Sequence, residues 1–338
     1  MFELALTTLF SPVVLFFVLG LAASLARSDL VVPEAAAKLL ALYLLLAIGY
    51  RGGTEVAHHG ASLQVLMALL AGLVLSALVP ILVFAWLRRL TGFSTIDAAA
   101  IAAHYGSISI VTFLAMTSVL EQVSLPYDGY MVAVAAAMEA PAIFVALLLA
   151  RRASAGGAGK VDGKLWREIA LNGSIVVLIG AFIIGALTGA QGMAKLKPFL
   201  VDVFPGFLCL FLLDMGLVAG KGLRQGWRLL SFHAYLFALV MPLVSAGLAL
   251  LTAIAIGLSP GSTAIFMTLA ASASYIAVPA ALRVALPEAN PALGLTLSLC
   301  ITFPFNLLIG IPLYLSVVGD YHILDLKERS VKGCSVLK

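Results

Sequence analysis

The sequence predicts an all-α polytopic membrane protein of about ten transmembrane helices in two inverted five-helix repeats, with broken fourth and ninth helices. Three observations predict this fold class. Of the 338 residues, 62% are hydrophobic and 11% charged, whereas a soluble domain has roughly 45–50% apolar and 25% charged residues. Apolar runs of roughly 17–25 residues, the length that crosses a bilayer, recur along the chain. The two halves also resemble each other at one constant offset.

Ten apolar runs are the expected spans. They lie near residues 10–26, 32–50, 61–87, 95–120, 129–150, 169–190, 199–220, 231–257, 262–285 and 292–318. Because Glu3 is the only charge before the first run, we expect that run to be a span and not a cleaved signal peptide. Cys209, Cys300 and Cys334 lie far apart without metal-site spacing, so we expect neither a disulfide nor a structural metal.

The positions of Lys and Arg predict the orientation, because cytoplasmic loops are enriched in both. Loops after odd-numbered spans carry most of them, which puts those loops in the cytoplasm and both termini outside. The basic C-terminal tail, 321–338, favours the reverse orientation. The Ala/Gly-rich segment 153–166 is then a cytoplasmic linker between a first repeat, 1–152, and a second repeat, 167–320.

The repeat is the strongest pattern in the sequence. A shift of 167 residues aligns Leu45–Gly49 with Leu212–Gly216, Gly53 with Gly220, Ala103 with Ala270, and Ser107 with Ser274. Since each half has an odd number of spans, the two copies cross the membrane in opposite senses, as in many secondary transporters. Chance similarity between Leu/Gly-rich helices is the alternative. The aligned glycines also form GxxxG motifs, which predict close helix contact within the fold or between subunits.

The fourth and ninth spans are both interrupted near mid-membrane, by His104–Ser109 and by Ser272–Pro279. Gly, Ser and Pro weaken or break a helix. Paired interruptions are typical of a transporter's binding site, where half-helix N-termini bind an anion and freed carbonyls bind a cation. Ordinary kinks, with serines bonded to their own helices, are the alternative.

Charged residues inside spans cost roughly 2.5–3.5 kcal/mol and are therefore functional candidates. Glu139, beside Pro141, is the first choice for a cation ligand. Asp97 begins the fourth helix, where a carboxylate also simply satisfies the helix N-terminus. Asp214 is either an ion ligand or a partner of Lys38.

Two uncharged candidates complete this set. Asn306 could supply a neutral oxygen, and His104 is either a packed neutral histidine or a proton-sensitive group. The sequence contains no P-loop, HExxH or recognisable Ser/His/Asp set, so we do not expect an enzyme. The net charge of +4 fits loops that meet anionic lipid better than nucleic acid.

At these residues the chain resembles the sodium-dependent bicarbonate transporters of cyanobacteria, the SbtA-type permeases, over nearly its whole length. The matching segments are Thr95–Ala98, Gly106–Ser109, Leu120–Glu121, Glu139–Ala142, Ala271–Ser274 through Pro279 to Arg283, and Ala289–Pro291. The resemblance implies a core domain with broken helices, a gate domain that trimerises, and Na⁺-coupled uptake of bicarbonate across a bacterial plasma membrane by elevator-like alternating access.

The resemblance also implies the site residues. Bicarbonate would bind at Gly106, Ser107, Ser109, Ser272, Ser274 and Tyr275, and Na⁺ at Glu139, Asp97, Thr112, Ser272 and Asn306. This chain departs from the family pattern at Tyr275, where relatives have Asp, and at Ala277, where they have Ser. The departures leave the number and ligands of the sodium ions open, and the short linker leaves regulation by a soluble PII-like protein open.

Energetics favour coupling to a cation. Moving a monovalent anion into a negative-inside cell costs about 2.3 kcal/mol per 100 mV, and one Na⁺ carried along cancels that cost. A sodium- or proton-coupled symporter of another small anion, such as a short carboxylate, is the alternative, and an anion channel ranks below both.

Overall fold

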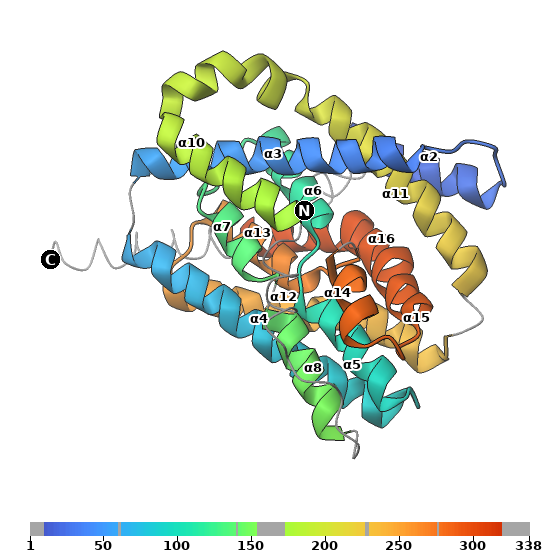
Figure 1. The fold of residues 1–338 in the computed structure, drawn as a ribbon. Helices are drawn as coiled ribbons and strands as arrows, with labels where there is room; N and C mark the ends of the chain where they lie inside the picture. The colour runs from blue at the N-terminus through green and yellow to red at the C-terminus, as the bar shows by residue number, and fades with distance from the viewer. Residues whose placement is uncertain are drawn as a thin grey trace, which may run out of the picture.

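The computed structural model describes residues 10–59, 62–139, 141–153, 173–226, 230–275 and 277–319, and all regular elements in these ranges are helices (Figure 1). The first half contains α2 (Pro12–Leu25), α3 (Glu34–His59), α4 (Leu63–Leu90), α5 (Thr95–Gly106), α6 (Ile110–Gln122), α7 (Met131–Ala137) and α8 (Pro141–Ala153). The second contains α10 (Gly173–Lys197), η1 (Pro198–Asp202), α11 (Phe204–Gly226), α12 (Phe232–Ile256), α13 (Pro260–Ala271), α14 (Ala277–Ala285), α15 (Pro291–Leu295), η3 (Thr296–Thr302), α16 (Phe303–Phe305) and η4 (Asn306–Gly310).

Eight helical runs in the described residues are long and apolar enough to cross a bilayer, so the chain is a multi-pass membrane protein. They coincide with the second to eighth and the tenth predicted spans. The first predicted span forms the shorter apolar helix α2, and the ninth forms α13 and α14. The all-helical membrane architecture is therefore confirmed.

Two predicted boundaries differ clearly from the structure. The second span is predicted to end near residue 50, but α3 continues to His59. The sixth span was expected to end near residue 190, but α10 continues to Lys197 and η1 follows directly. Gly189 lies inside α10 with a φ of 56°, a conformation that glycine adopts without steric cost. The chain therefore bends at Gly189 and resumes its helix, and the expected loop is helical.

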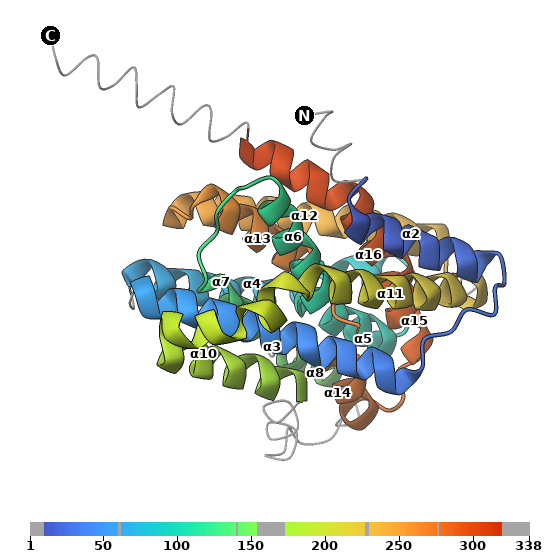
Figure 2. The same cartoon turned by 90° about the horizontal axis from the view of Figure 1, so that it is seen from above.

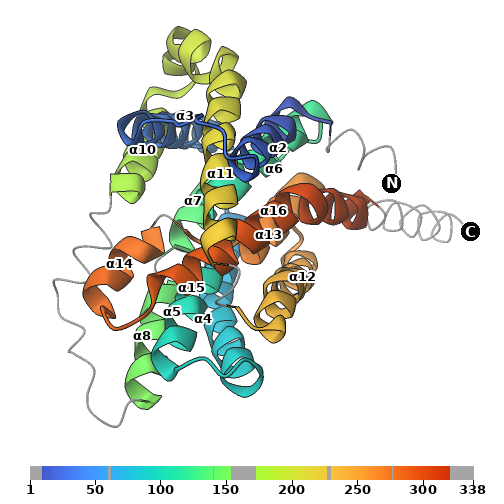
Figure 3. The same cartoon turned by 90° about the vertical axis from the view of Figure 1, so that its right-hand side faces the viewer.

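Four helices form a separate unit, in which α3 lies along α10 and α2 lies along α11 (Figures 1 and 2). We call these four helices the gate unit, and α4–α8 with α12–α16 the core unit. Figure 3 shows the gate unit along one side of the core unit. The long apolar helices α4 and α12 contact each other and pack on α5 and α13, respectively, inside the core unit.

Both GxxxG motifs lie in the contacts of the gate unit. A Cβ atom at Gly53 of α3 would collide with the carbonyl oxygen of Phe182 in α10, and one at Gly216 of α11 with the carbonyl oxygen of Phe17 in α2. These helices therefore touch through their backbones, an approach that small residues permit. Of the two alternatives left open by the sequence, the glycines make the contact within the fold.

The interrupted segments lie at the centre of the core unit. The helix α5 ends at Gly106 and α6 begins at Ile110, with extended backbone at Ser107 and Ser109 between them. The helix α13 ends at Ala271 and continues into extended backbone at Ser272. In the most apolar part of the run from α5 to α6, 94% of the residues are buried, so protein and not lipid surrounds this run.

Candidate functional site

The two interrupted segments contact each other directly. The backbone N–H of Ser109 donates to the hydroxyl of Ser272 at 2.8 Å. The N–H of Ser274 donates to the carbonyl of His104 at 2.7 Å. The imidazole Nδ1 of His104 lies 2.6 Å from the carbonyl oxygen of Ser274. Both segments are buried, so these hydrogen bonds fix one break against the other.

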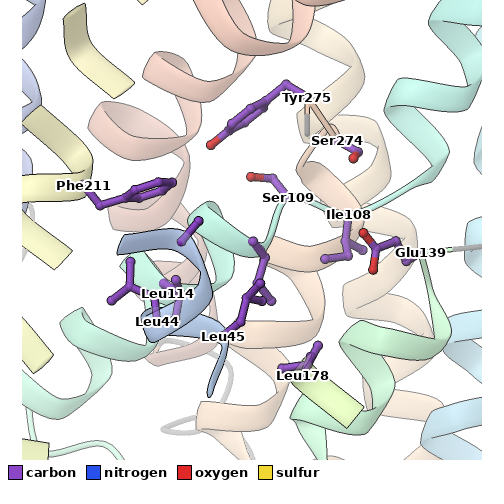
Figure 4. A pocket seen from close by; sticks show the side chains of 12 residues that line it. Leu44, Leu45, Ile108, Ser109, Leu114, Glu139, Leu178, Phe211, Ser274 and Tyr275 are labelled. Atoms are coloured by element: carbon purple, nitrogen blue, oxygen red, sulfur yellow. The ribbon is translucent and has the colours of Figure 1, made fainter. Parts of the chain in front are cut away.

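A cavity of about 40 Å³ lies between the breaks and the gate unit (Figure 4). Its polar lining comes from Ser109, Ser274, Tyr275 and Glu139, and its apolar lining from Ala41, Leu44, Leu45, Ile108, Ile110, Leu114, Leu178 and Phe211. Since roughly 10–15 Å³ of such space holds one water molecule, the cavity has room for a few non-hydrogen atoms. A small ion fits this volume, and a large organic molecule does not.

Glu139 faces this cavity from the segment between α7 and α8 (Figure 4). The helix α7 ends at Ala137 and α8 begins at Pro141, so Glu139 lies in the connection between two helices. The hydroxyl of Ser76 donates to the carbonyl of Met138 at 2.6 Å and holds this segment against α4. Within the described residues, the half-buried Glu139 carboxylate has neither a hydrogen bond nor an ion pair. An unpaired carboxylate in such surroundings is a candidate cation ligand.

Within the part of the chain that the structure describes, three hydroxyls predicted for the site are buried without a hydrogen-bond partner: Ser107 Oγ, Thr112 Oγ1 and Tyr275 Oη. Tyr275 lines the cavity, whereas Ser107 and Thr112 flank the lining segment along the chain. A buried hydroxyl without a partner costs about 1–3 kcal/mol. A bound ion would offset this cost.

Two other predicted substrate residues have structural contacts in this conformation. The hydroxyl of Ser272 accepts from Ser109 and donates to the carbonyl of Leu269 at 2.8 Å. Gly106 packs so closely on Pro80 of α4 that a Cβ atom would collide with the ring. Gly106 lies at the first break and Ser272 at the second, and neither lines the cavity.

Asp97 lies at the opposite end of α5 from the break. Its carboxylate accepts from the hydroxyl of Ser94 at 2.6 Å and from the backbone N–H of Asn290 at 2.8 Å. Nine helical residues separate Asp97 from Gly106, about 14 Å at 1.5 Å per residue. The structure does not bring Asp97 to the cavity.

Asn306 also lies outside the cavity lining. Its side-chain amide donates to the carbonyl of Ala271, the last residue of α13, at 2.8 Å, and its oxygen accepts from Tyr314 at 2.9 Å. Asp214 is buried in α11 and has no ion pair with Lys38, which instead pairs with Glu34 at 2.7 Å.

The sequence reasoning missed two features of this region. The first is the double contact of His104 with Ser274. The second is an open cleft of about 640 Å³ at the far ends of α3 and α6, where Arg51 pairs with Glu121. A signal for the second existed, because Arg51 lies inside the first GxxxG motif and Glu121 in a segment that resembles the transporter family.

The structure is that of a multi-pass membrane protein with a buried, partly polar cavity between its interrupted helices, which suits a transporter. The chain matches the Na⁺-dependent bicarbonate transporter superfamily over residues 12–319 and therefore belongs to that family. It is a transporter and not an enzyme, and the family agrees with bicarbonate as the transported substrate and Na⁺ as the coupling ion. No curated protein sequence matches the chain significantly.

Proposed function

We propose that the protein takes up bicarbonate together with Na⁺, binding the anion in the cavity between the two helix breaks and the cation beside it at Glu139. One observation carries this proposal. The N-terminus of α6 and the unpaired carboxylate of Glu139 border the same small cavity. A group suited to an anion and a group suited to a cation thus lie at one site.

The anion site is at the start of α6. The first N–H groups of a helix have no intrahelical acceptor and lie at its positive end, so those of Ile110 and Val111 can donate to an anion. The hydroxyls of Ser274 and Tyr275 add donors from the second break. Ser107 supplies a further buried hydroxyl, which gains its missing partner through a small local movement.

The cation site is at Glu139. Sodium is a hard cation that prefers oxygen ligands, and the unpaired Thr112 hydroxyl on α6 is a second candidate oxygen. Without a cation, the Glu139 carboxylate would repel bicarbonate strongly in these low-dielectric surroundings. Bound Na⁺ removes this repulsion, so each ion favours the other. The charges alone therefore couple the binding of bicarbonate to the binding of Na⁺.

The size of the cavity limits the anion to about four non-hydrogen atoms, which admits bicarbonate and the alternative of a short carboxylate such as formate or acetate. An occupant of four non-hydrogen atoms fits a space of about 40 Å³, whereas each added carbon requires the lining of Leu44, Leu45 and Phe211 to move.

We also infer that residues 1–152 and 167–320 are inverted repeats related by a pseudo-twofold axis. Reciprocal contacts support this relation. The segment after α14 reaches the start of α5, where Asn290 donates to Asp97. The segment after α6 reaches the start of α13, where the hydroxyls of Ser259 and Ser262 donate to Asp128 at 2.7 and 2.6 Å. The pairing of α3 with α10 and of α2 with α11 is reciprocal in the same way.

Alternating access then follows from movement of the core unit against the gate unit. The gate unit is held by backbone contacts at its glycines, and the ion site belongs mainly to the core unit. Displacement of the core unit would carry the cavity, with both ions, from one side of the membrane to the other.

Assembly and orientation rest on the resemblance and on the charge pattern. We propose a homotrimer formed by gate units in a bacterial plasma membrane, with both termini outside and the linker 153–166 in the cytoplasm. This linker, apart from Ala153, and the tail 321–338 lie outside the described residues. Control by a soluble PII-like protein stays an open part of the proposal.

The test is uptake of ¹⁴C-labelled bicarbonate into proteoliposomes at fixed pH, with and without an inward Na⁺ gradient. Carbonic anhydrase controls for leakage of CO₂. We expect accumulation that depends on the gradient, and we expect Ser274→Ala to weaken apparent bicarbonate affinity. If correctly folded wild-type protein shows no sodium-dependent uptake, another anion or another coupling ion must replace this pair.

A further inference from the structure

We infer that His104 is a positioning residue for the anion site, acting through Ser274. The inference rests on the proposed function and adds a residue that does not itself reach the cavity. His104 lies in the last turn of α5 and is 2% exposed. It contacts Ser274 at two points, through its backbone carbonyl and through its ring.

These two contacts define the tautomer of the His104 ring and use both hydrogen-bonding groups of the Ser274 backbone. A carbonyl oxygen cannot donate, so the Nδ1 atom of His104 carries the hydrogen and donates to Ser274 over 2.6 Å. Both polar backbone groups of Ser274 are thus bound to one residue. Only the Ser274 side chain is left to meet an ion in the cavity.

The bond to the carbonyl has an electrostatic consequence. A carbonyl oxygen carries partial negative charge, and one that turned into the cavity would repel an anion. The His104 ring holds the Ser274 carbonyl away from this position, so that a donor and not an acceptor faces bicarbonate. Donors aligned in advance bind more strongly because they need not reorganise.

Among the described residues, the double contact of His104 with Ser274 is not repeated at the equivalent position of the second half, so the repeat does not require it. The position 167 residues after His104 is Ala271, whose carbonyl is bound by Asn306 at 2.8 Å. On its other side the His104 ring packs on Gly294, where an added Cβ atom would crowd Nε2. A cavity of about 130 Å³, lined by His104, Pro279 and Gly294 among others, adjoins the ring. This space can accommodate side chains of a different shape at position 104, so we expect the substituted proteins to fold.

The test compares three substitutions in proteoliposomes. His104→Asn places an amide N–H near the position of Nδ1, His104→Gln places it near Nε2, and His104→Leu has no donor. At saturating Na⁺ we expect His104→Asn to keep the bicarbonate KM within about threefold of wild type. We expect His104→Gln and His104→Leu to raise KM about tenfold, equivalent to about 1.4 kcal/mol. The maximal rate should change less.

A double-mutant cycle separates positioning from a purely structural role. If His104 positions the Ser274 hydroxyl, His104→Leu should raise KM less in a Ser274→Ala background than in wild type, because only the effect of the released backbone carbonyl, which alanine keeps, is left. Equal effects in both backgrounds would overturn the inference, as would a wild-type KM in His104→Leu. Should the wild type carry a different anion, the bicarbonate proposal fails, and the same cycle on that anion still decides the role of His104.

Discussion

Arg51 of the gate unit forms an ion pair with Glu121 of the core unit, at the mouth of the open cleft. Its guanidinium also lies 6.0 Å from the ring centre of Phe204. The Arg51 and Glu121 side chains are 23% and 40% exposed, so the pair contributes only about 0–1 kcal/mol to stability. The pair therefore matters less for folding than for its position between the two units that we propose to move.

The first prediction concerns this position. Arg51→Cys and Glu121→Cys, combined with removal of Cys209, Cys300 and Cys334, allow the units to be linked by a bis-methanethiosulfonate reagent, which joins the two thiols through reducible disulfide bonds. We expect linkage to arrest uptake and reduction to restore it, because the core unit can no longer move against the gate unit.

The matched control for this linkage is Lys197→Cys with Asp202→Cys. This pair joins the end of α10 to η1, the segment that connects α10 to α11 of the gate unit, where Lys197 lies 3.9 Å from Asp202. Its linkage should leave uptake unchanged. Full uptake by fully linked Arg51/Glu121 protein would contradict movement between the units.

The second prediction concerns the unpaired hydroxyl of Thr112. Thr112→Val should raise the Na⁺ concentration for half-maximal uptake while leaving the melting temperature unchanged or higher, because a buried hydroxyl without a partner costs about 1–3 kcal/mol. Thr117→Val is the control, since that hydroxyl donates to the carbonyl of Leu114 on the same helix. An unaltered sodium dependence in Thr112→Val would remove Thr112 from the cation site.

The third prediction separates Glu139 from Asn306, which occupy equivalent positions under the 167-residue shift. Glu139→Gln should abolish sodium dependence and preserve thermal stability, because it removes an unpaired carboxylate. Asn306→Ala should leave the Ala271 carbonyl without its partner and destabilise the fold by about 1–3 kcal/mol. Uptake kinetics and melting in detergent distinguish the two variants, and the reverse result would exchange their roles.

The fourth prediction concerns helix contact in the gate unit. Gly53→Ala should lower the melting temperature, because its Cβ atom meets the carbonyl of Phe182, and overpacking costs about 1–3 kcal/mol. Gly180→Ala on the facing helix has open space around its Cβ atom and should be neutral or stabilising, since alanine favours helices. Equal melting temperatures for both variants would show that the close approach does not contribute to stability.

The spans could be predicted from sequence because apolar length is a local property that the bilayer imposes. The break near Ser107 could also be predicted, since Gly and Ser next to each other weaken a helix locally. The continuation of the sixth span beyond residue 190 could not be predicted from the sequence. Lys195 and Pro198 indicate a loop, yet Pro is compatible with the first turn of the π-helical segment that follows.

The partners of the site residues were not predictable, because tertiary contacts select them. Ser272 and Asn306 carry side chains as suitable for an ion as that of Ser274. Contact with Ser109 and with Ala271 uses those groups in hydrogen bonds between segments. For Asp97 the sequence offers a purely local alternative, the satisfaction of its own helix start, but its carboxylate accepts both from the neighbouring Ser94 hydroxyl and from the distant backbone N–H of Asn290.

The glycine contacts of the gate unit also limit how this chain can diverge. Where two backbones touch, as at Gly53 and Gly216, even a single methyl group has no space. We therefore expect these glycines to be conserved among related chains, while residues on the lipid-facing sides of the same helices vary. Invariant glycines spaced four apart would then mark these close helix contacts without any structure.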